Sequence, residues 1–378
     1  MKSLVYPPEL EAYWVKTAQA ATKGTSLRDT LHRILPDIQR LADRFTLERP
    51  ALHAAATPYL KDTRTCAAYS LFFTPQSYMR MAYILSERPL PPIGEKPLRI
   101  LDLGAGTGGA LWPLLDVLAD RPSQVTAWDA SRAALRCLHD AFSALRRSRW
   151  PQTILRTQAA AVKDYLPGPE RYDYILLHYV LNELSAEERS TLLARAARSL
   201  APEGTLILCE PLLHAEGDYM RDIRTAALQS FGLHPLAPCP HAGPCPLGEP
   251  CQCVRTWPLT QATQILNTAL RRDLRHLAYS FLMLSPTPAL SSTTGTLQVR
   301  LIAPPTHAKG HTICPACCPD GELHPIQLLH RHLDAPGRKA VRHLERGQCL
   351  ALRDLLASRS AEAPWKGLPV DLAAPGAS

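Results

Sequence analysis

The residues of this sequence that are best suited to chemistry are cysteines gathered in a proline-rich loop. The stretch CPHAGPCPLGEPCQC, residues 239–253, places four cysteines and four prolines in fifteen residues, and a second group, CPACC, occupies residues 314–318. Thiolates bind zinc or iron–sulfur clusters, and a cysteine followed by proline is also found at the last ligand of bacterial ferredoxins. Scattered buried thiols would not explain so polar a loop. The sequence therefore predicts a metal or cluster site, with zinc and an iron–sulfur cluster both open.

A glycine-rich stretch, ILDLGAGTGG at residues 100–109, is the second such feature. Its glycines would let a strand-to-helix turn approach a ligand closely, and they are Gly104, Gly106 and Gly108. Asp102 precedes them, and Asp129 ends the next predicted strand, where an acidic side chain can accept hydrogen bonds from the ribose hydroxyls of an adenosine. Gly104, Gly106 and Gly109 also satisfy the G-x-G-x-x-G pattern of dinucleotide-binding sites. However, Asp102 and the glycines after it form D-x-G-x-G-x-G, which favours a methyl donor as the ligand.

This loop resembles the first motifs of the class I methyltransferases, which bind S-adenosyl-L-methionine. The resemblance implies that Asp102 helps to hold the methionine amino group of the donor. One departure is Pro113, which would interrupt the following helix unless that helix starts late.

Polar residues also end a later apolar strand, in YVLNEL at residues 179–184. Methyltransferases place residues that face donor and substrate there, so Asn182 is a candidate for donor binding, together with Glu183 as a site residue. The alternative is that Asn182 begins a helix and Glu183 is exposed. The segment has neither N-P-P-[YF], which marks amide methylation, nor a cysteine nucleophile. The sequence therefore assigns no catalytic residue.

Alternating strands and helices must position these residues. After residue 98, short β-rich runs alternate with helical segments such as 131–145 and 185–200, which predicts a parallel sheet with helices on both faces. The predicted strands are 98–103, 124–129, 153–158, 172–180, 204–210, 277–285 and 296–305. A capping box of Ser185 and Glu188 begins one helix, and apolar spacing predicts helices before residue 95, with a break or kink at Pro36.

Composition limits the partners and the location. The 378 residues include 42 Lys and Arg against 34 Asp and Glu, which gives a net charge of +8 and a pI near 9.0. This charge suits RNA, although a generic basic protein would show the same balance. No apolar run is long enough to span a membrane, and no signal or transit peptide is evident. We expect a monomer in a bacterial-type cytoplasm, where thiols stay reduced.

Four segments of the chain resemble one particular family. These are APCPHAGPCPL, SFLMLS, APPTHAKGHTICPACCPDGEL and RKAVRHLERG. The family is that of the methyltransferase-like assembly factors of the small ribosomal subunit, which includes mitochondrial methyltransferase-like protein seventeen and bacterial relatives. The resemblance covers about residues 65–350. It implies a class I methyltransferase fold, a [4Fe–4S] cluster held by four cysteines, and small-subunit ribosomal RNA as the partner.

Carried over by motif, the resemblance implies that the cluster ligands are Cys239, Cys245, Cys253 and Cys318. Three additional thiols depart from the family pattern, namely Cys251, Cys314 and Cys317. The ligands at the third and fourth positions are therefore open between neighbouring cysteines, and zinc remains the alternative metal.

We therefore expect an α/β, class I methyltransferase-like Rossmann sheet with a helical N-terminal domain and a cysteine-rich C-terminal extension. The predicted parts are a helical domain at 1–95, the donor-binding core at 96–235, the iron–sulfur and RNA-binding extension with the final strands at 236–354, and a disordered tail at 355–378. The expected function is small-subunit assembly through ribosomal RNA binding, with or without RNA methylation. The alternative is a zinc-containing, S-adenosylmethionine-dependent methyltransferase of another substrate.

Overall fold

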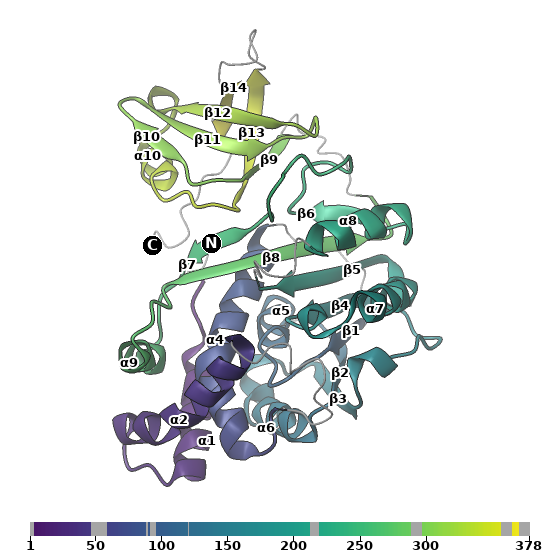
Figure 1. The fold of residues 1–378 in the computed structure, drawn as a ribbon, viewed down its shortest axis with the longest axis vertical. Coiled ribbons are helices and arrows are strands. Elements are labelled where there is room, and N and C mark those ends of the chain that lie inside the picture. The colour runs from purple at the N-terminus through teal and green to yellow at the C-terminus, as the bar shows by residue number, and fades with distance from the viewer. Residues whose placement is uncertain are drawn as a thin grey trace.

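The chain forms a helix-covered sheet with a small barrel beside one edge of it (Figure 1). The computed structural model describes residues 4–46, 59–87, 90, 96–119, 121–211, 219–288, 297–356 and 365–369. Most of the predicted disordered tail, 355–378, lies outside these residues, but 365–369 form a strand of the barrel.

The central sheet has the strand order β3-β2-β1-β4-β5-β8-β6, and β7 also pairs with β8. Strands β1 to β5 are parallel, whereas β8 runs antiparallel to β5, β6 and β7. Their bounds are Leu98–Leu103, Ser123–Asp129, Thr153–Ala159, Tyr172–His178, Leu200–Glu210, His234–Ala237, Cys253–Thr256 and His276–Ser285, for β1 to β8 in order. The parallel α/β sheet predicted from the sequence is confirmed, and β8 extends it with a strand from the predicted cysteine-rich part.

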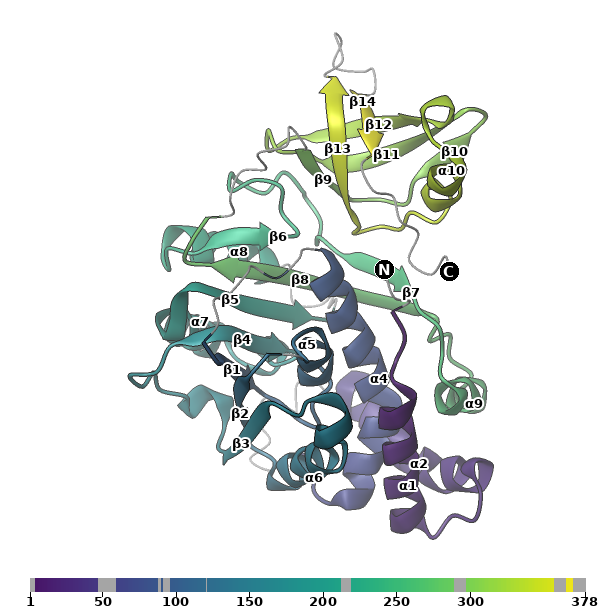
Figure 2. The same ribbon diagram turned by 180° about the vertical axis from the view of Figure 1, so that it is seen from behind.

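Helices cover both faces of this sheet, as Figures 1 and 2 show from opposite sides. Helices α4, α5 and α6 lie on one face, and α7 and α8 lie on the other, with α9 beside α2. The bounds of α5 to α9 are Leu111–Val117, Arg132–Arg149, Ala186–Ser199, Tyr219–Gln229 and Gln261–Leu270. The capping box of Ser185 and Glu188 is present at the start of α7. Pro113 falls in the first turn of α5, where a missing backbone N–H costs little.

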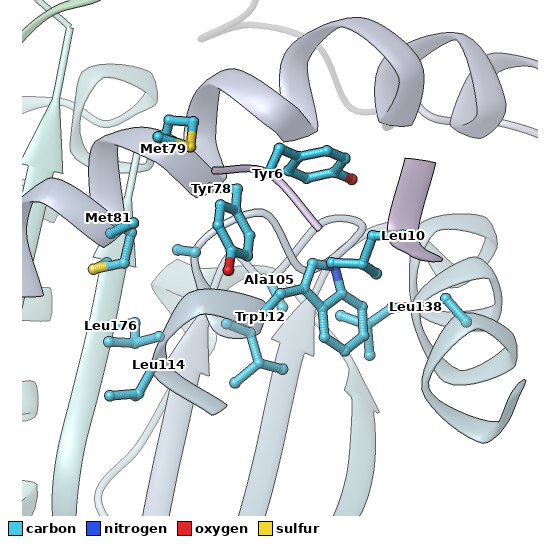
Figure 3. Packing of buried hydrophobic residues seen from close by; sticks show 14 of the residues in the cluster. Tyr6, Leu10, Tyr78, Met79, Met81, Ala105, Trp112, Leu114, Leu138 and Leu176 are labelled. Atoms are coloured by element: carbon cyan, nitrogen blue, oxygen red, sulfur yellow. The ribbon is translucent and has the colours of Figure 1, made fainter. Parts of the chain in front are cut away.

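The N-terminal helices pack onto the sheet rather than standing apart. They are α1, α2 and α4, at Pro8–Thr22, Leu27–Thr46 and Thr63–Glu87. Helix α2 continues through Pro36, so the predicted break does not occur. Figure 3 shows Tyr78 of α4 beside Trp112 of α5, above the strands. Tyr78 donates a 2.6 Å hydrogen bond to Asp116, which also accepts one from Trp150, so buried polar contacts join the α4, α5 and α6 region.

The C-terminal strands form a second sheet with its own apolar core. The strands β9 to β14 are Leu297–Leu301, Thr306–Ala308, His311–Cys317, Leu323–Leu329, Cys349–Leu356 and Trp365–Pro369. The helix α10, Ala335–Val341, separates β12 from β13. This sheet lies beyond the β6 and β8 edge of the central sheet (Figures 1 and 2).

Candidate functional site

A cavity of about 680 Å³ opens where β1, β2 and β4 end. Ligands of open parallel sheets bind at the carboxyl ends of the strands, beside the point where the strand order reverses. That point lies between β1 and β4 here, because β2 and β3 continue on one side and β5 on the other. Residues of α4, including Tyr69, Gln76 and Arg80, complete the wall. The helical region is therefore part of this pocket.

The glycine loop lies against the pocket in a backbone conformation that requires glycine. Gly104 and Gly108 have φ of +83° and +89°. A Cβ on Gly108 would come within 2.4 Å of the Trp112 ring, and one on Gly104 would come within 2.3 Å of Val180. Gly106 also lines the pocket, with a φ of +52° and nothing within 4 Å of where its Cβ would be, so the loop presents backbone to the open space there, as close contact with a ligand requires.

Asp129 holds this loop in place. Its Oδ2 accepts a 2.8 Å hydrogen bond from the Gly106 N–H, and its Oδ1 accepts a 2.7 Å bond from the Ser131 N–H. Ser131 in turn caps α6 by accepting from the Ala134 N–H. Each carboxylate oxygen can accept a second hydrogen bond. Asp129 can thus order the loop and still accept from a ligand hydroxyl.

Asp102 is a buried acceptor that lacks a donor. Its side chain is 1% exposed and its Oδ2 has no hydrogen-bond partner. Burial, followed by the neighbouring Asp129 charge, raises the pKa of Asp102 to about 8. A cation in the pocket would reverse this shift, since an opposite charge favours the carboxylate.

A carboxylate that the sequence did not mark organises the opposite wall. Glu210 ends β5, is fully buried, and accepts hydrogen bonds from the backbone N–H groups of Val180, Leu181 and Asn182 at 3.0, 2.9 and 3.2 Å. The Tyr219 hydroxyl donates to it at 3.1 Å. Burial raises the pKa of Glu210 to about 7, against these four donors. An acidic residue at a strand end was visible in the sequence, but nothing in its spacing related it to YVLNEL.

The segment after β4 brings further polar groups to the pocket. Asn182 lines it, and its Oδ1 is buried without a hydrogen-bond partner. Tyr179 has a φ of +61°, and its ring lies 4.7 Å from that of His178 and 5.1 Å from the Arg80 guanidinium. Burial lowers the pKa of His178 to about 3, so its imidazole is neutral. Glu183 also lines the pocket, and its role as a site residue stays a prediction.

A second cavity lies between α8, β8 and the barrel strands, and cysteines line it. They come from the proline-rich loop and from the end of β11, and they are Cys239, Cys245, Cys251 and Cys317. His241 is a further lining residue, and its Nε2 lies 3.4 Å from the Cys317 sulfur. Burial raises the pKa of Cys317 to about 12.

Two buried arginines donate to the sulfur atoms of this cysteine cavity. Arg224, 4% exposed, reaches the Cys239 sulfur at 3.2 Å, and Arg300, 2% exposed, reaches the Cys251 sulfur at 3.1 Å. Arg224 also donates to the backbone carbonyls of His241 and Gly243, and Arg300 donates to the Gly347 carbonyl and to the Cys253 sulfur. Within the described ranges neither guanidinium forms an ion pair with a carboxylate. Two buried positive charges therefore face a group of thiols.

The structure brings together two of the four cysteines that the resemblance implied as ligands. Cys253 is fully buried in β7, with its sulfur 3.6 Å from the Gly347 carbonyl and 3.4 Å from Arg300. Cys318 belongs to the apolar core of the barrel. Neither lines the cavity, whereas Cys251 and Cys317 do. In the described part of the chain, no three His, Cys, Asp or Glu side chains are placed to hold a metal ion.

The family model described as mitochondrial small ribosomal subunit Rsm22 matches residues 63–350. This is more than half of the 378 residues. The chain belongs to this family. The matched range includes both the glycine loop and the cysteine cavity, so the Rsm22 family unit spans the two candidate sites. A comparison with curated proteins finds no match.

Solved methyltransferases resemble this member of the Rsm22 family in part. A glycopeptide N-methyltransferase is 19% identical over 37% of this chain and 55% of its own, with a TM-score of 0.30. The PKMT2 protein of Rickettsia typhi is 23% identical over 41% of this chain and 29% of its own, with a TM-score of 0.30. This chain therefore spans less than two thirds of either protein. Magnesium protoporphyrin IX methyltransferase from Synechocystis is 16% identical over 66% of this chain and 97% of its own, with a TM-score of 0.36.

Among the helices in the described ranges, none combines the length and apolar content that a bilayer-spanning segment needs. The family description names the mitochondrial small ribosomal subunit, so a bacterial cytoplasm remains a prediction, as does the monomeric state.

Proposed function

We propose that this chain binds S-adenosyl-L-methionine in the pocket at the carboxyl ends of β1, β2 and β4, and binds small-subunit ribosomal RNA as an assembly factor. The family match supports the ribosomal partner, and the +8 charge suits RNA. The single observation that carries the donor site is the buried, unpartnered Oδ2 of Asp102 beside the glycine loop.

The chemistry of the pocket fits each part of the donor. Asp102 supplies an anionic acceptor for the methionine ammonium, and the exposed backbone of the glycine loop leaves room for the chain between amino acid and nucleoside. Asp129, at the end of β2, can accept from the ribose hydroxyls, and the buried, unpartnered Oδ1 of Asn182 can accept from a further donor. The cavity volume of about 680 Å³ is within the usual range for small-molecule sites.

Methyl transfer to RNA is a separate question from donor binding. A neutral His178, Tyr179 and Asn182 line the pocket, and none of its described lining residues is a cysteine that could act as a nucleophile. Isotopic methyl transfer from labelled donor to purified small-subunit RNA separates an RNA methyltransferase from an assembly factor that retains the pocket as a scaffold. Incorporation of label into that RNA by the unmodified protein, absent with Asp102→Ala, would establish the enzyme.

We also propose that the cysteine cavity holds the [4Fe–4S] cluster through Cys239, Cys245, Cys251 and Cys317. The buried guanidiniums of Arg224 and Arg300 support a negatively charged group there, since an uncompensated buried charge is costly. Four thiolates around a cluster with charge +2 leave a net charge of −2, which balances the two arginines. Hydrogen bonds from guanidinium to sulfur also tune such clusters.

The role of this site is structural in our proposal. Cys239, Cys245 and Cys251 lie in the loop beside the sheet, whereas Cys317 and Arg300 belong to barrel strands. A bound cluster would supply covalent cross-links between the two parts, so metal binding would contribute to folding. Four thiolates around one zinc ion would balance the same charge, so zinc is the second candidate. Visible absorbance and iron content of anaerobically purified protein decide between them, because a zinc protein is colourless.

A further inference from the structure

The C-terminal strands close into a ring. Strand β9 pairs with β11, β11 with β12, β12 with β14, β14 with β13, and β13 again with β9. All of these pairs are antiparallel except β12 and β14, which are parallel. Helix α10 joins the third strand of the ring to the fourth, and β10 is a short addition that pairs only with β11. This is the five-stranded Greek-key connectivity of oligonucleotide-binding barrels, the OB-folds.

The inside and outside of this barrel alternate along its strands. Val299, Leu301, Ile326, Leu328 and Leu352 are among the buried side chains that fill the interior. The residues of β11 and β12 that alternate with the buried positions are partly or fully exposed, and they are His311, Ile313, Pro315, Leu323, Pro325 and Gln327. In OB-folds, ligands lie across the second and third strands and beside the loop that joins the first to the second. Here that face is β11 and β12, with the β10 hairpin beside it.

Basic side chains gather at one end of that face, and we call them the basic rim. They are His307, Lys309, His311, His330, Arg338 and Arg342. Thr312 links two of them, because its hydroxyl lies 3.0 Å from His307 Nδ1 and 2.9 Å from His330 Nε2. The His330 N–H donates to the Gly310 carbonyl at 2.9 Å, which places the Lys309 turn beside it.

Other groups of the basic rim act on the charge of His330. Burial lowers the pKa of His330, and the positive charges of Arg342 and Arg338 and the imidazoles of His307 and His311 lower it further. The carboxylate of Asp334, at the start of α10, is occupied as a helix cap by the Gly337 N–H. The acidic residues of the hairpin, Asp320 and Glu322, lie at its other end, where β11 leads into β12.

We propose that the β10–β11–β12 face of this barrel binds single-stranded RNA, with phosphates on the basic rim. The inference rests on the proposed function and names the surface that performs it. Imidazole rings and the apolar side chains of Ile313 and Leu323 offer flat or apolar contacts for unpaired bases. A single RNA strand can lie along β11 and β12 with its bases against them, whereas an A-form RNA duplex presents only its wide minor groove and phosphates to a protein. A neutral oligosaccharide would leave the rim charges without partners.

The test uses the full-length protein, a labelled single-stranded RNA of mixed sequence, and the same RNA as a duplex. The variant is R338E/R342E, both exposed on the rim. The matched control is R146E/R147E, an exposed pair at the end of α6 that changes the net charge equally. Unchanged thermal unfolding confirms that both variants fold.

We expect R338E/R342E to bind the single strand at least about tenfold more weakly, and R146E/R147E to remain within about twofold. The slope of log affinity against log salt should fall by about 1.4, at ~0.7 for each lost phosphate contact. Wild-type protein should prefer the single strand to the duplex.

Three results would overturn the assignment. If the wild type binds small-subunit RNA but R338E/R342E binds it equally well, the barrel face is refuted while the proposed function stands. An equal loss in R146E/R147E, or a preference for the duplex, refutes it in the same way. A wild-type protein that binds no RNA refutes both the barrel face and the proposed function.

Discussion

Arg300 of β9 donates a hydrogen bond across 3.1 Å to the sulfur of Cys251, in the loop beside the central sheet. The bond crosses from the barrel to the sheet, and both residues line the cysteine cavity. The joint between the two parts of the molecule is therefore the same place as the candidate cluster site. A group bound there would therefore contact both parts and strengthen the attachment of the barrel.

A pair of serine substitutions tests which cysteines bind the metal. We predict that Cys251→Ser loses most of its iron and visible absorbance, because Cys251 lines the cavity. Cys253→Ser should keep both, because its sulfur points toward the Gly347 carbonyl outside the lining. The motif carried over from the family predicts the opposite outcome. Iron content of the two variants, purified anaerobically beside wild type, is the measurement; iron lost only from Cys253→Ser would refute the geometric assignment.

Donor binding should depend on pH through Asp102. In the free protein burial raises the pKa of this carboxyl to about 8, and the ligand ammonium favours the ionised form. Binding of S-adenosylhomocysteine should therefore release a proton near pH 7, and affinity should fall by up to about tenfold for each pH unit below 8. Calorimetry in buffers of different ionisation enthalpy measures the proton release. Asp102→Asn should abolish it, and identical proton release in the variant would exclude Asp102 as the group.

The same shift has a consequence for stability. Asp102 and Glu210 have folded-state pKa values of about 8 and about 7, both raised by burial. The stability contributed by protonation is fully present below the unfolded pKa, near 4, and is lost as pH rises through 7 to 8. Thermal unfolding of the free protein between pH 5 and 8 should show a falling Tm, with a shallower slope in Asp102→Asn. A Tm that rises over this window would contradict the protonated state of both groups.

Asp129→Ala should destabilise the glycine loop as well as weaken donor binding. The substitution removes the acceptor of the Gly106 and Ser131 N–H groups, at about 1–3 kcal/mol for each buried donor left unpaired. Asp140→Ala, on the exposed side of α6, is the matched control and should change stability by less than about 0.5 kcal/mol. Chemical denaturation and calorimetry with S-adenosylhomocysteine give both readouts. Equal stability of the two variants would refute the bracing role of Asp129.

Sequence predicted the sheet well because its strands are short β-rich runs separated by clear helical periods. It did not predict the barrel. The strands β11 and β12 contain Pro315 and Pro325, and proline is unusual inside a strand. The parallel pairing of β12 with β14 joins residues that are almost 40 positions apart in the chain. Closure of that ring depends on pairings that no local pattern records. The cysteine cavity was predicted as a site, but only folding shows which of several neighbouring thiols face it.

The role of Glu210 could not be predicted from the sequence, because it depends on contacts between distant segments. Its role comes from three backbone N–H groups almost thirty residues earlier in the chain, which only the neighbouring positions of β4 and β5 bring to it. We predict that Glu210→Gln costs about 1–3 kcal/mol and weakens donor binding, because an amide NH2 would replace one of the two oxygens that accept from four donors. Glu203→Gln, exposed near the start of the same strand, is the control. Denaturation midpoints that coincide for the two variants would show that the buried carboxylate does not hold the segment after β4.

The most direct test of the central claim is the affinity of the full-length, metal-loaded protein for purified small-subunit ribosomal RNA, compared with large-subunit ribosomal RNA at the same salt concentration. We predict tighter binding to small-subunit RNA, by about tenfold or more, with an affinity that falls steeply as salt rises because phosphate contacts release counterions. Equal affinity for the two RNAs, or no binding at low salt, would contradict it.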